Sequence, residues 1–267
     1  MTGSPTLSLS AADDMATLRE VAELFGAVWG WTAEGLPVSS EMLRSMAHAG
    51  GLVTVARTGD RLVGAAVLGR DVPGEAYGYI AAVRPGLADR GVGFALKQHQ
   101  RAWSLEQGIG VLRWTFDPLV ARNARFNLTK LGAVVRDYES AFYGRMSDRL
   151  NGSDDADRLV PEWWLDSERA VAAAAGQELD PGEPPVGSPD VVDAADGPDG
   201  LPAYAALPDV GWVRVPADIV DLRRRDPGQA SVWRGFVRDR LGGDLGDGFV
   251  AVGVSRTGWY RLERDPA

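Results

Sequence analysis

The stretch from Tyr77 to Gln107 joins a strand pattern to a helix pattern through a loop with two glycines. The run YGYIAAVRP is apolar and ends at a proline, which predicts a strand. The following LADRGVGFAL places Gly91 and Gly93 in a GxG where a helix is expected to begin. Unpaired N–H groups at such a helix N-terminus, together with the helix dipole, bind phosphate oxygens. The loop therefore predicts a ligand that carries phosphate.

Two common phosphate-binding motifs do not fit this loop. A Walker-type loop needs Lys and then Ser or Thr after its last glycine, and Val92 and Gly93 occupy those positions. A dinucleotide fingerprint needs a third small residue where this chain has Leu96. It also belongs to an early βαβ unit, whereas a predicted hairpin precedes this loop.

The surrounding patterns indicate a mixed α/β chain. Two helices with capping residues open it, a β-hairpin and a third strand follow, and two helices and further strands come after the glycine loop. The expected helices are 13–30, 39–50, 91–107 and 121–132, and the expected strands are 52–57, 61–69, 77–85, 111–116, 133–146 and 158–165. Pro216 and Pro227 fit first-turn positions of two further helices near the C-terminus, between strands.

Composition suggests three segments. Residues 166–209 are acidic, rich in Pro and Gly and almost without periodic apolar residues, which predicts a linker that is at least partly mobile. Residues 1–165 form the main predicted domain. Residues 210–267 form a small α/β extension that is expected to pack on it, because it is short for an independent fold.

Charge and cysteine content exclude several function classes. The 267 residues are 45% apolar and carry a net charge of −9, with no Cys and two His. A thiolate metal site or Cys nucleophile is therefore excluded, and no metal site is expected. No basic stripe with interleaved aromatics predicts nucleic-acid binding, and no apolar run predicts a membrane span. A cytoplasmic protein is the expectation.

The order of elements resembles the GNAT superfamily of acyl-CoA-dependent N-acyltransferases over roughly residues 10–165. The family motif, Arg or Gln followed after two residues by GxG or GxA, falls on Ala88, Gly91 and Gly93. The segment WTFDPLVARNARFNLTKLGA is similar to a GNAT subgroup that carries WTFDP. The resemblance implies a GNAT-like central mixed sheet flanked by helices, with the small α/β piece as an extension.

The resemblance also implies which residues contact the acyl-CoA. Val83 would offer backbone to the pantetheine arm, and the glycine loop would hold the pyrophosphate. Ala88 stands where the family has Arg or Gln, so Arg84 or Arg90 would supply the missing charge. The full expected set is Val83, Arg84, Ala88, Arg90, Gly91, Val92, Gly93, Phe94, Asn123 and Asn127.

Transfer of an acyl group to an amine needs a base and donors to the oxyanion, and an acid for the leaving thiolate. The family's usual Tyr acid is absent, since its position is Leu128. We expect Glu75 or Asp117 as base and Tyr143 as proton donor or substrate contact, with Tyr79 and Asn127 as further candidates. Each has a structural alternative: a solvated Glu75, an N-cap at Asp117, strand packing at Tyr143 and a helix start at Asn123.

The sequence thus predicts an acyl-CoA-dependent N-acyltransferase, with acetyl-CoA as the default donor. The acceptor is expected to be a primary amine of a small metabolite, acylated directly in a ternary complex. The sequence is compatible with a homodimer but does not determine the oligomeric state. The alternative is a non-catalytic GNAT-like module that binds CoA or a metabolite or pairs subunits, which Ala88 and Leu128 keep in play.

Overall fold

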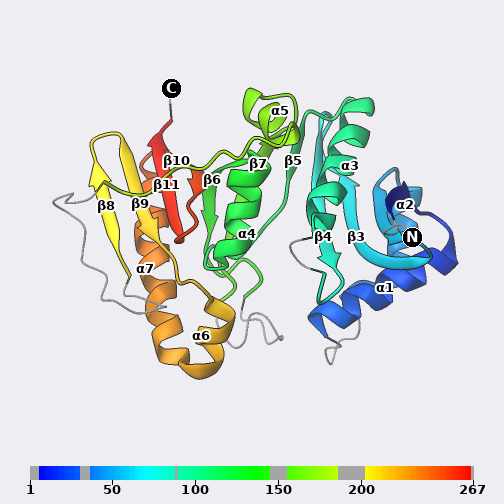
Figure 1. Cartoon of the computed structure of the whole chain (residues 1–267), viewed down its shortest axis with the longest axis horizontal. Helices are drawn as coiled ribbons and strands as arrows, with labels where there is room; N and C mark the ends of the chain where they lie inside the picture. The colour runs from blue at the N-terminus through cyan, green and yellow to red at the C-terminus, as the bar shows by residue number, and fades with distance from the viewer. Residues whose placement is uncertain (1–5, 31–36, 88–89, 145–154, 186–201, 266–267) are drawn as a thin grey trace, which may run out of the picture. The chain divides into compact units, whose positions relative to one another are not determined.

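The computed structural model describes residues 6–30, 37–87, 90–144, 155–185 and 202–265 (Figure 1). The chain divides into two compact units, Met1–Arg113 and Trp114–Ala267, called unit 1 and unit 2 below. Each is a β-sheet flanked by helices, so the predicted mixed α/β class is confirmed. The boundary after Arg113 is not one of those that composition suggests.

Unit 1 is built on a mixed five-stranded sheet. Its strands, in spatial order, are β1 (Leu7–Ala11), β2 (Leu52–Thr58), β3 (Arg61–Arg70), β4 (Glu75–Val83) and β5 (Val111–Arg113). All neighbours are antiparallel except β4 and β5, which are parallel. The predicted hairpin and third strand are confirmed. β1 is an addition, a short edge strand whose placement comes from its pairing with β2.

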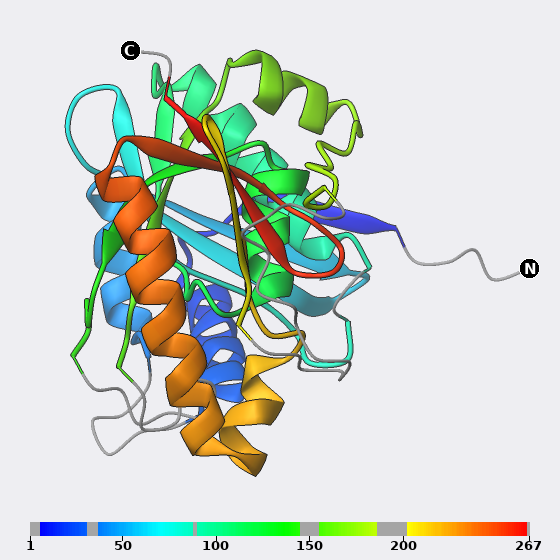
Figure 2. The same cartoon turned by 90° about the vertical axis from the view of Figure 1, so that its left-hand side faces the viewer.

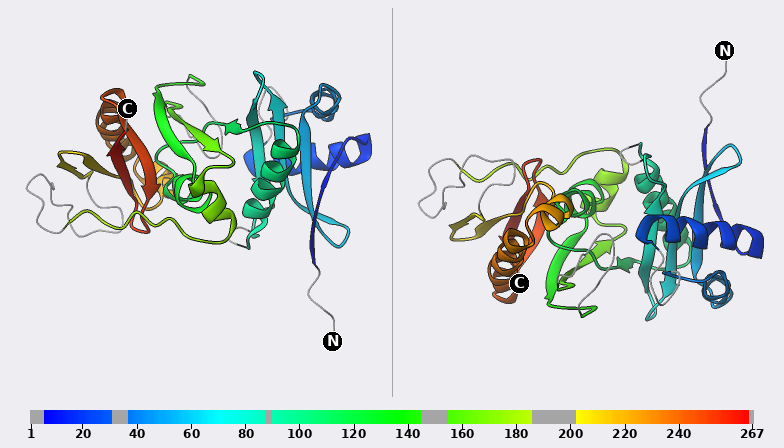
Figure 3. Two further views of the ribbon diagram at one scale, coloured as in Figure 1. Left: turned by 90° about the horizontal axis from the view of Figure 1, so that it is seen from above. Right: turned by 90° about the horizontal axis from the view of Figure 1, so that it is seen from below.

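Helices cover both faces of this sheet (Figure 3). α1 (Met15–Trp29) and α2 (Ser40–His48) start at the predicted caps, since Asp14 and Ser39 accept hydrogen bonds from Thr17 and Met42 backbone N–H groups. They pack on one face around a core that includes Phe25, Leu43, Val53 and Val67. α3 (Val92–Glu106) covers the other face through Val92 and Leu96, which contact Ala56 and Ala66.

A glycine on β3 lets α3 approach the sheet closely. A Cβ atom at Gly64 would lie 2.9 Å from Val92 Cγ1 and 3.0 Å from Leu96 Cδ1. Close helix-to-strand packing therefore does not need a small residue at position 96, since the strand supplies it. Leu96 is fully buried as a result.

Unit 2 holds a six-stranded antiparallel sheet (Figures 1 and 2). Its spatial order is β7 (Arg158–Trp164), β6 (Val134–Glu139), β10 (Phe249–Val254), β11 (Trp259–Arg264), β9 (Val210–Arg214) and β8 (Tyr204–Leu207). The C-terminal strands join the earlier ones where Ala251 of β10 pairs with Val135 of β6. The helical elements are α4 (Ala121–Arg125), the π-helical η1 (Phe126–Lys130), α5 (Glu168–Ala174), α6 (Ile219–Arg225) and α7 (Pro227–Gly246).

Several boundaries differ from the sequence-based ones. The helix expected over 121–132 changes to π-helical pairing after Arg125, and the strand expected over 133–146 ends at Glu139. Pro227 begins α7 as predicted. Pro216 does not begin a helix, because α6 starts at Ile219 with Asp218 as its cap.

The segment predicted as a linker is ordered in part. It contains α5 and β8, and the residues after α5 pack against the rest of unit 2. Glu178 pairs with Arg125 and Arg256, and the Leu179 N–H donates to the Thr129 carbonyl. The arginine partners of Glu178 are more than 50 residues away in the sequence, so composition alone does not predict these ion pairs. No helix within the described ranges is long and apolar enough to cross a membrane.

Replacing Gly64 by Ala is expected to destabilise the protein by about 1–3 kcal/mol, because the new methyl group overpacks the contact with α3. Urea unfolding of the purified protein measures the change. Gly110→Ala is the matched control, since a Cβ there meets no atom within 4 Å. Equal stabilities for the two variants would contradict this account of α3 packing.

Candidate functional site

The N-terminus of α3 presents backbone donors in the way the GxG pattern predicts. Gly91 is the N-cap in the left-handed conformation, with φ 79° and ψ −5°, and makes no side-chain cap. Its carbonyl accepts from the Ala95 N–H at 2.9 Å. The N–H groups of Val92, Gly93 and Phe94 meet no acceptor among the described residues. Ala88 lies outside those residues.

The loop is also open to a ligand. A Cβ at Gly91 would meet nothing within 4 Å, so an incoming group can approach the backbone. Arg90 is exposed directly before it. Arg84 is partly committed elsewhere, since its Nε donates to the Leu62 carbonyl at 2.9 Å. Between the two, Arg90 is the better placed to add charge to the loop.

Strand β4 has an edge that β5 leaves uncovered. Parallel pairing with β5 extends only from Glu75 to Tyr77, and beyond that no described strand pairs with this edge. The Arg84 N–H donates to the Val63 carbonyl of β3 at 2.8 Å. Because successive residues of an antiparallel pair alternate in direction, the Val83 N–H faces the uncovered edge. Val83 thus presents a donor where the resemblance implies one.

Glu75, at the start of β4, is half-buried and forms an ion pair with Arg113 of β5. Glu75 is therefore not the solvated loop residue of the structural alternative. The Glu75 carboxylate can still accept a proton, but its ion pair with Arg113 must first break.

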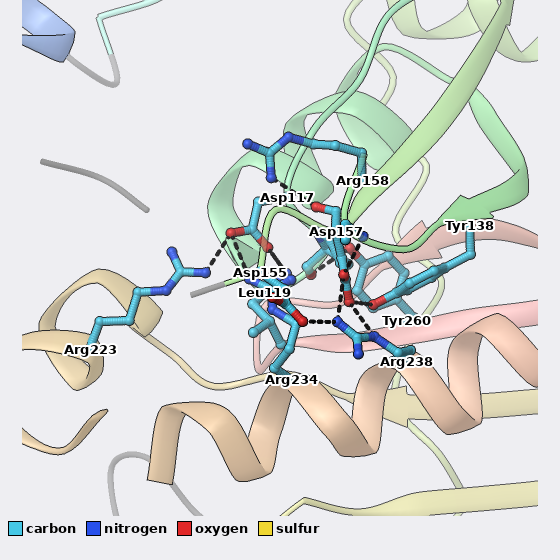
Figure 4. Close-up of polar contacts among 12 residues, drawn as sticks. Asp117, Leu119, Tyr138, Asp155, Asp157, Arg158, Arg223, Arg234, Arg238 and Tyr260 are labelled. Atoms are coloured by element: carbon cyan, nitrogen blue, oxygen red, sulfur yellow. Dashed lines mark hydrogen bonds and ion pairs between the residues drawn. The ribbon is translucent and has the colours of Figure 1, made fainter. Parts of the chain in front are cut away.

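Asp117 is enclosed by arginines of the C-terminal helices (Figure 4). Arg234 donates to both of its oxygens at 3.0 and 3.1 Å, and Arg223 donates to one at 2.7 Å. Its Oδ1 also accepts from the Leu119 N–H at 3.0 Å, forming a turn before α4. The side chain is only 7% exposed.

These contacts do not suit a general base. Burial by itself raises the pKa of the Asp117 carboxyl, but the charges and hydrogen bonds of Arg234 and Arg223 outweigh it and lower the pKa to about 2. A carboxylate of that pKa takes up almost no proton near neutral pH. The N-cap alternative is wrong for Asp117, because the N-cap of α4 is Val120. Asp117 is instead a buried ion-paired carboxylate that orders the turn before this helix.

Tyr143 lies in a turn after β6 and is 51% exposed. Its hydroxyl is 3.2 Å from Thr115 Oγ1, and the Arg158 guanidinium lies 5.2 Å from its ring centroid. Phe142 packs edge-to-face on it, with ring centroids 4.6 Å apart. The pair is not strand packing, because β6 has already ended at Glu139. Tyr143 keeps an exposed hydroxyl-bearing ring available for a substrate.

The two asparagines differ in their surroundings. Asn123 is exposed on α4, whereas Asn127 is buried in η1 with an Nδ2 that has no hydrogen-bond partner among the described residues. An unpaired buried donor is uncommon, and π-helical turns often occur at functional sites. Leu128 beside it is fully buried and offers no proton.

The predicted residues therefore fall into two groups, each within one unit. Unit 1 brings together Val83, Arg84 and Arg90–Phe94, with Glu75 at the far end of β4. Unit 2 carries Asp117, Asn123, Asn127 and Tyr143. Within the described ranges, no group of His, Cys, Asp or Glu could hold a metal ion.

Sequence reasoning missed four charged residues around the unit 2 group. They are Asp157, Arg223, Arg234 and Arg238. Arg223 belongs to a run that reads as a solvated helix face. Arg234 and Arg238 offered a signal, since they occur four residues apart beside the apolar positions Trp233, Val237 and Leu241 of one helix.

A GxG-capped helix that follows a strand with an uncovered edge is the arrangement that the resemblance to the GNAT superfamily implies. A sequence model of the acetyltransferase (GNAT) domain matches residues 2–117. Residues 2–117 therefore match a GNAT acetyltransferase domain, as the resemblance predicts. The match ends at Asp117, so the likeness of residues 114–133 to a WTFDP subgroup stays a prediction.

Solved structures of acetyltransferases are similar to this chain at low sequence identity. The ribosomal-protein-S18-alanine N-acetyltransferase from Escherichia coli is 16% identical over 61% of this chain and 96% of that one, with a TM-score of 0.47. A Bacillus subtilis acetyltransferase in complex with CoA is 18% identical over 59% and 97%, also at 0.47. A GNAT-family acetyltransferase from Streptococcus pneumoniae is 14% identical over 59% and 98%, at 0.48. No curated protein sequence matches.

Replacing Asp117 by Asn is expected to destabilise the protein by about 3–5 kcal/mol at pH 7, because two guanidiniums would lose their buried partner. The folded-state pKa of about 2 lies below the ordinary 3.8. The stabilisation is therefore complete above about pH 4 and is lost as the pH falls toward 2. Urea unfolding between pH 7 and 2 should show the difference between the two proteins narrowing in that window.

Asp221→Asn is the matched control, since this aspartate also has two arginine partners, Arg224 and Arg225, but on the surface of α6. Its cost is expected to stay below about 1 kcal/mol. A small, pH-independent effect of Asp117→Asn would show that the buried pair contributes little.

Proposed function

We propose that this protein transfers an acyl group from an acyl-CoA, with acetyl-CoA as the default donor, to the primary amine of a small metabolite. The observation that carries the proposal is the glycine-capped start of α3 beside the uncovered edge of β4, within a GNAT domain. The proposed location is the cytoplasm, where acyl-CoA is at hand.

The α3 N-terminus supplies the binding energy for the donor. The N–H groups of Val92, Gly93 and Phe94 point where pyrophosphate oxygens would sit, and the helix dipole adds a favourable potential. Arg90 supplies the charged hydrogen-bond donor to the pyrophosphate that the Ala88 side chain cannot provide. Asn123 and Asn127 are the proposed contacts from unit 2.

Val83 serves the chemical step in this proposal. Its N–H faces the uncovered edge of β4 and would donate to the thioester carbonyl oxygen, which becomes an oxyanion when the amine attacks. The tetrahedral centre then collapses, the C–S bond breaks, and CoA leaves as a thiolate. A direct attack by the amine is proposed because the chain has no Cys to carry the acyl group.

Proton transfer needs the least from the protein. The amine must be neutral to attack, and Glu75 is the remaining proposed base once Asp117 is committed to its arginines. Because Glu75 and Val83 lie at opposite ends of β4, the amine proton would reach Glu75 through a chain of water molecules. Tyr143 is the proposed proton donor to the thiolate, or a contact for the acceptor. A thiolate is stable enough near neutral pH that a weak acid suffices.

A non-catalytic CoA-binding module remains the second candidate. One observation favours it: Leu128 is fully buried where many family members carry a tyrosine acid. The two candidates share the CoA site and differ in turnover.

Replacing Gly91 by Asp is expected to abolish CoA binding, because a negative side chain then occupies the donor cradle. CoA at 100 times its dissociation constant should stabilise the wild type by about 2.7 kcal/mol and leave the variant unchanged. Thermal unfolding with CoA and acyl-CoAs measures both. Gly108→Asp is the control, because Gly108 at the other end of α3 has a similarly positive φ of 72°. Absence of a shift for the wild type would remove both candidate functions.

Turnover separates the two candidates. A panel of acyl-CoA donors against amines, followed by thiol release, should reveal at least one productive pair, and Glu75→Gln should lower its kcat by about 100-fold or more. Glu20→Gln is the control, since Glu20 also pairs with an arginine, Arg57, in unit 1. CoA binding without thiol release for any amine would favour the binding module, and an unchanged kcat would clear Glu75 of a base role.

A further inference from the structure

Helix α7 directs two arginines from one face toward two aspartates of the preceding chain (Figure 4). Arg234 and Arg238 are one helical turn apart and reach Asp117 and Asp157, respectively. Trp233, the residue before the first of them, is fully buried, so this part of α7 packs against the core of unit 2. The two ion pairs are therefore held at a fixed spacing by the helix.

The Arg234 contact continues into the segment that begins α4. Arg234 grips both Asp117 oxygens, and Asp117 Oδ1 accepts the Leu119 N–H. The Val120 N–H then donates to the Asp117 carbonyl, and α4 follows at Ala121. The direction in which α4 and η1 leave this turn depends on where Asp117 is held.

The Arg238 contact continues into the turn that carries the exposed aromatic pair. Arg238 donates to the two Asp157 oxygens at 2.8 and 2.9 Å, and Asp157 Oδ1 accepts the Ala141 N–H at 2.9 Å. Ala141 has a φ of 51° and is the only non-glycine residue with positive φ within the described ranges. That conformation is strained and persists only when its surroundings hold it. Phe142 and Tyr143 follow directly.

Asp157 is enclosed on every side. The Tyr138 hydroxyl donates to its Oδ2 at 2.7 Å, and Arg238 also reaches Asp155 at 3.0 Å. Burial raises the pKa of Asp157, but the bonds from Arg238, the Ala141 N–H and Tyr138 prevail and lower it. Asp157 is thus a charged acceptor that connects α7 to a backbone N–H, in the same way as Asp117.

We propose that Arg234 and Arg238 are positioning residues: Arg234 fixes the α4 segment and Arg238 fixes the 141–143 turn, so that these two candidate segments of unit 2 are held separately. This inference rests on the proposed function, in which Asn123 and Asn127 contact the donor and Tyr143 contacts the acceptor or the leaving group. Buried ion pairs are poor sources of net stability, because desolvation offsets their attraction. Here two such ion pairs lie on one helix, and the aspartate of each accepts a hydrogen bond from a backbone N–H of a candidate site segment. Their role is therefore to fix the positions of these segments.

The Leu119 and Ala141 N–H groups report on the two contacts separately. Hydrogen–deuterium exchange of the full chain should show the Ala141 N–H exchanging about tenfold faster or more in Arg238→Gln, with the Leu119 N–H unchanged. Arg234→Gln should give the reverse pattern. Arg240→Gln is the control on the same helix, because Arg240 lies over the Tyr204 ring and contacts neither aspartate.

Kinetics then tests the assignment of the two segments. Arg238→Gln should raise the amine KM about tenfold and leave the dissociation constant of CoA unchanged, whereas Arg234→Gln should raise that dissociation constant. Arg238→Lys and Arg234→Lys, which keep the charge and one hydrogen bond, should recover part of each loss. They also replace the Gln variants if those fail to fold.

The outcomes separate this inference from the proposed function. Equal acceleration of both reporter N–H groups in both variants would overturn separate positioning, as would a joint rise of the amine KM and the CoA dissociation constant. A wild type that neither binds CoA nor releases thiol would remove the proposed function and with it the site assignment. The exchange pattern would then still show whether α7 holds the two segments independently.

Discussion

The buried carboxylate of Asp117 is the contact on which the arrangement of unit 2 depends. It receives Arg234 in a two-bond contact and Arg223 in a third bond, and all three side chains are less than a tenth exposed. None of these charges could remain buried without the others, because an unpaired ion in the interior is costly. The C-terminal helices and the chain before α4 are therefore tied to each other. The acidic residues after α5 extend the same principle at the surface, through Arg125 and Arg256.

Backbone geometry, by contrast, carries the candidate donor site of unit 1. A left-handed Gly91 starts α3 without a side-chain cap, and Gly64 lets the helix settle close to β3. Short parallel pairing of β5 leaves β4 beyond Tyr77 with an edge that no strand within the described ranges covers. Main-chain N–H groups at fixed positions can bind phosphate and stabilise an oxyanion without a charged side chain. In the proposed function, these N–H groups take the role of the Arg or Gln that Ala88 replaces.

Much of the fold could be predicted from the sequence, because local signals agreed with the tertiary structure. Asp14 and Ser39 cap the two helices that were predicted to begin there, the 52–69 hairpin forms, and Gly91 is the N-cap of α3. The edge strands β1 and β8 were missed because each has only four or five residues and gains its conformation by pairing with a neighbouring strand. The π-helical turn at Phe126–Lys130 was missed because it has no distinct local pattern.

The sequence by itself determined the glycine-capped helix, the order of elements and the resemblance to the GNAT superfamily, since these depend on residues close together along the chain. Only the tertiary structure decided the part that Asp117 plays. Its arginine partners lie 106 and 117 residues away, so no local pattern contains them. A carboxylate is a base or a structural anion according to the charges around it, and chain folding alone brings those charges into place. The same holds for Asp157, which accepts the Ala141 N–H and is held by Arg238 of the helix that begins at Pro227.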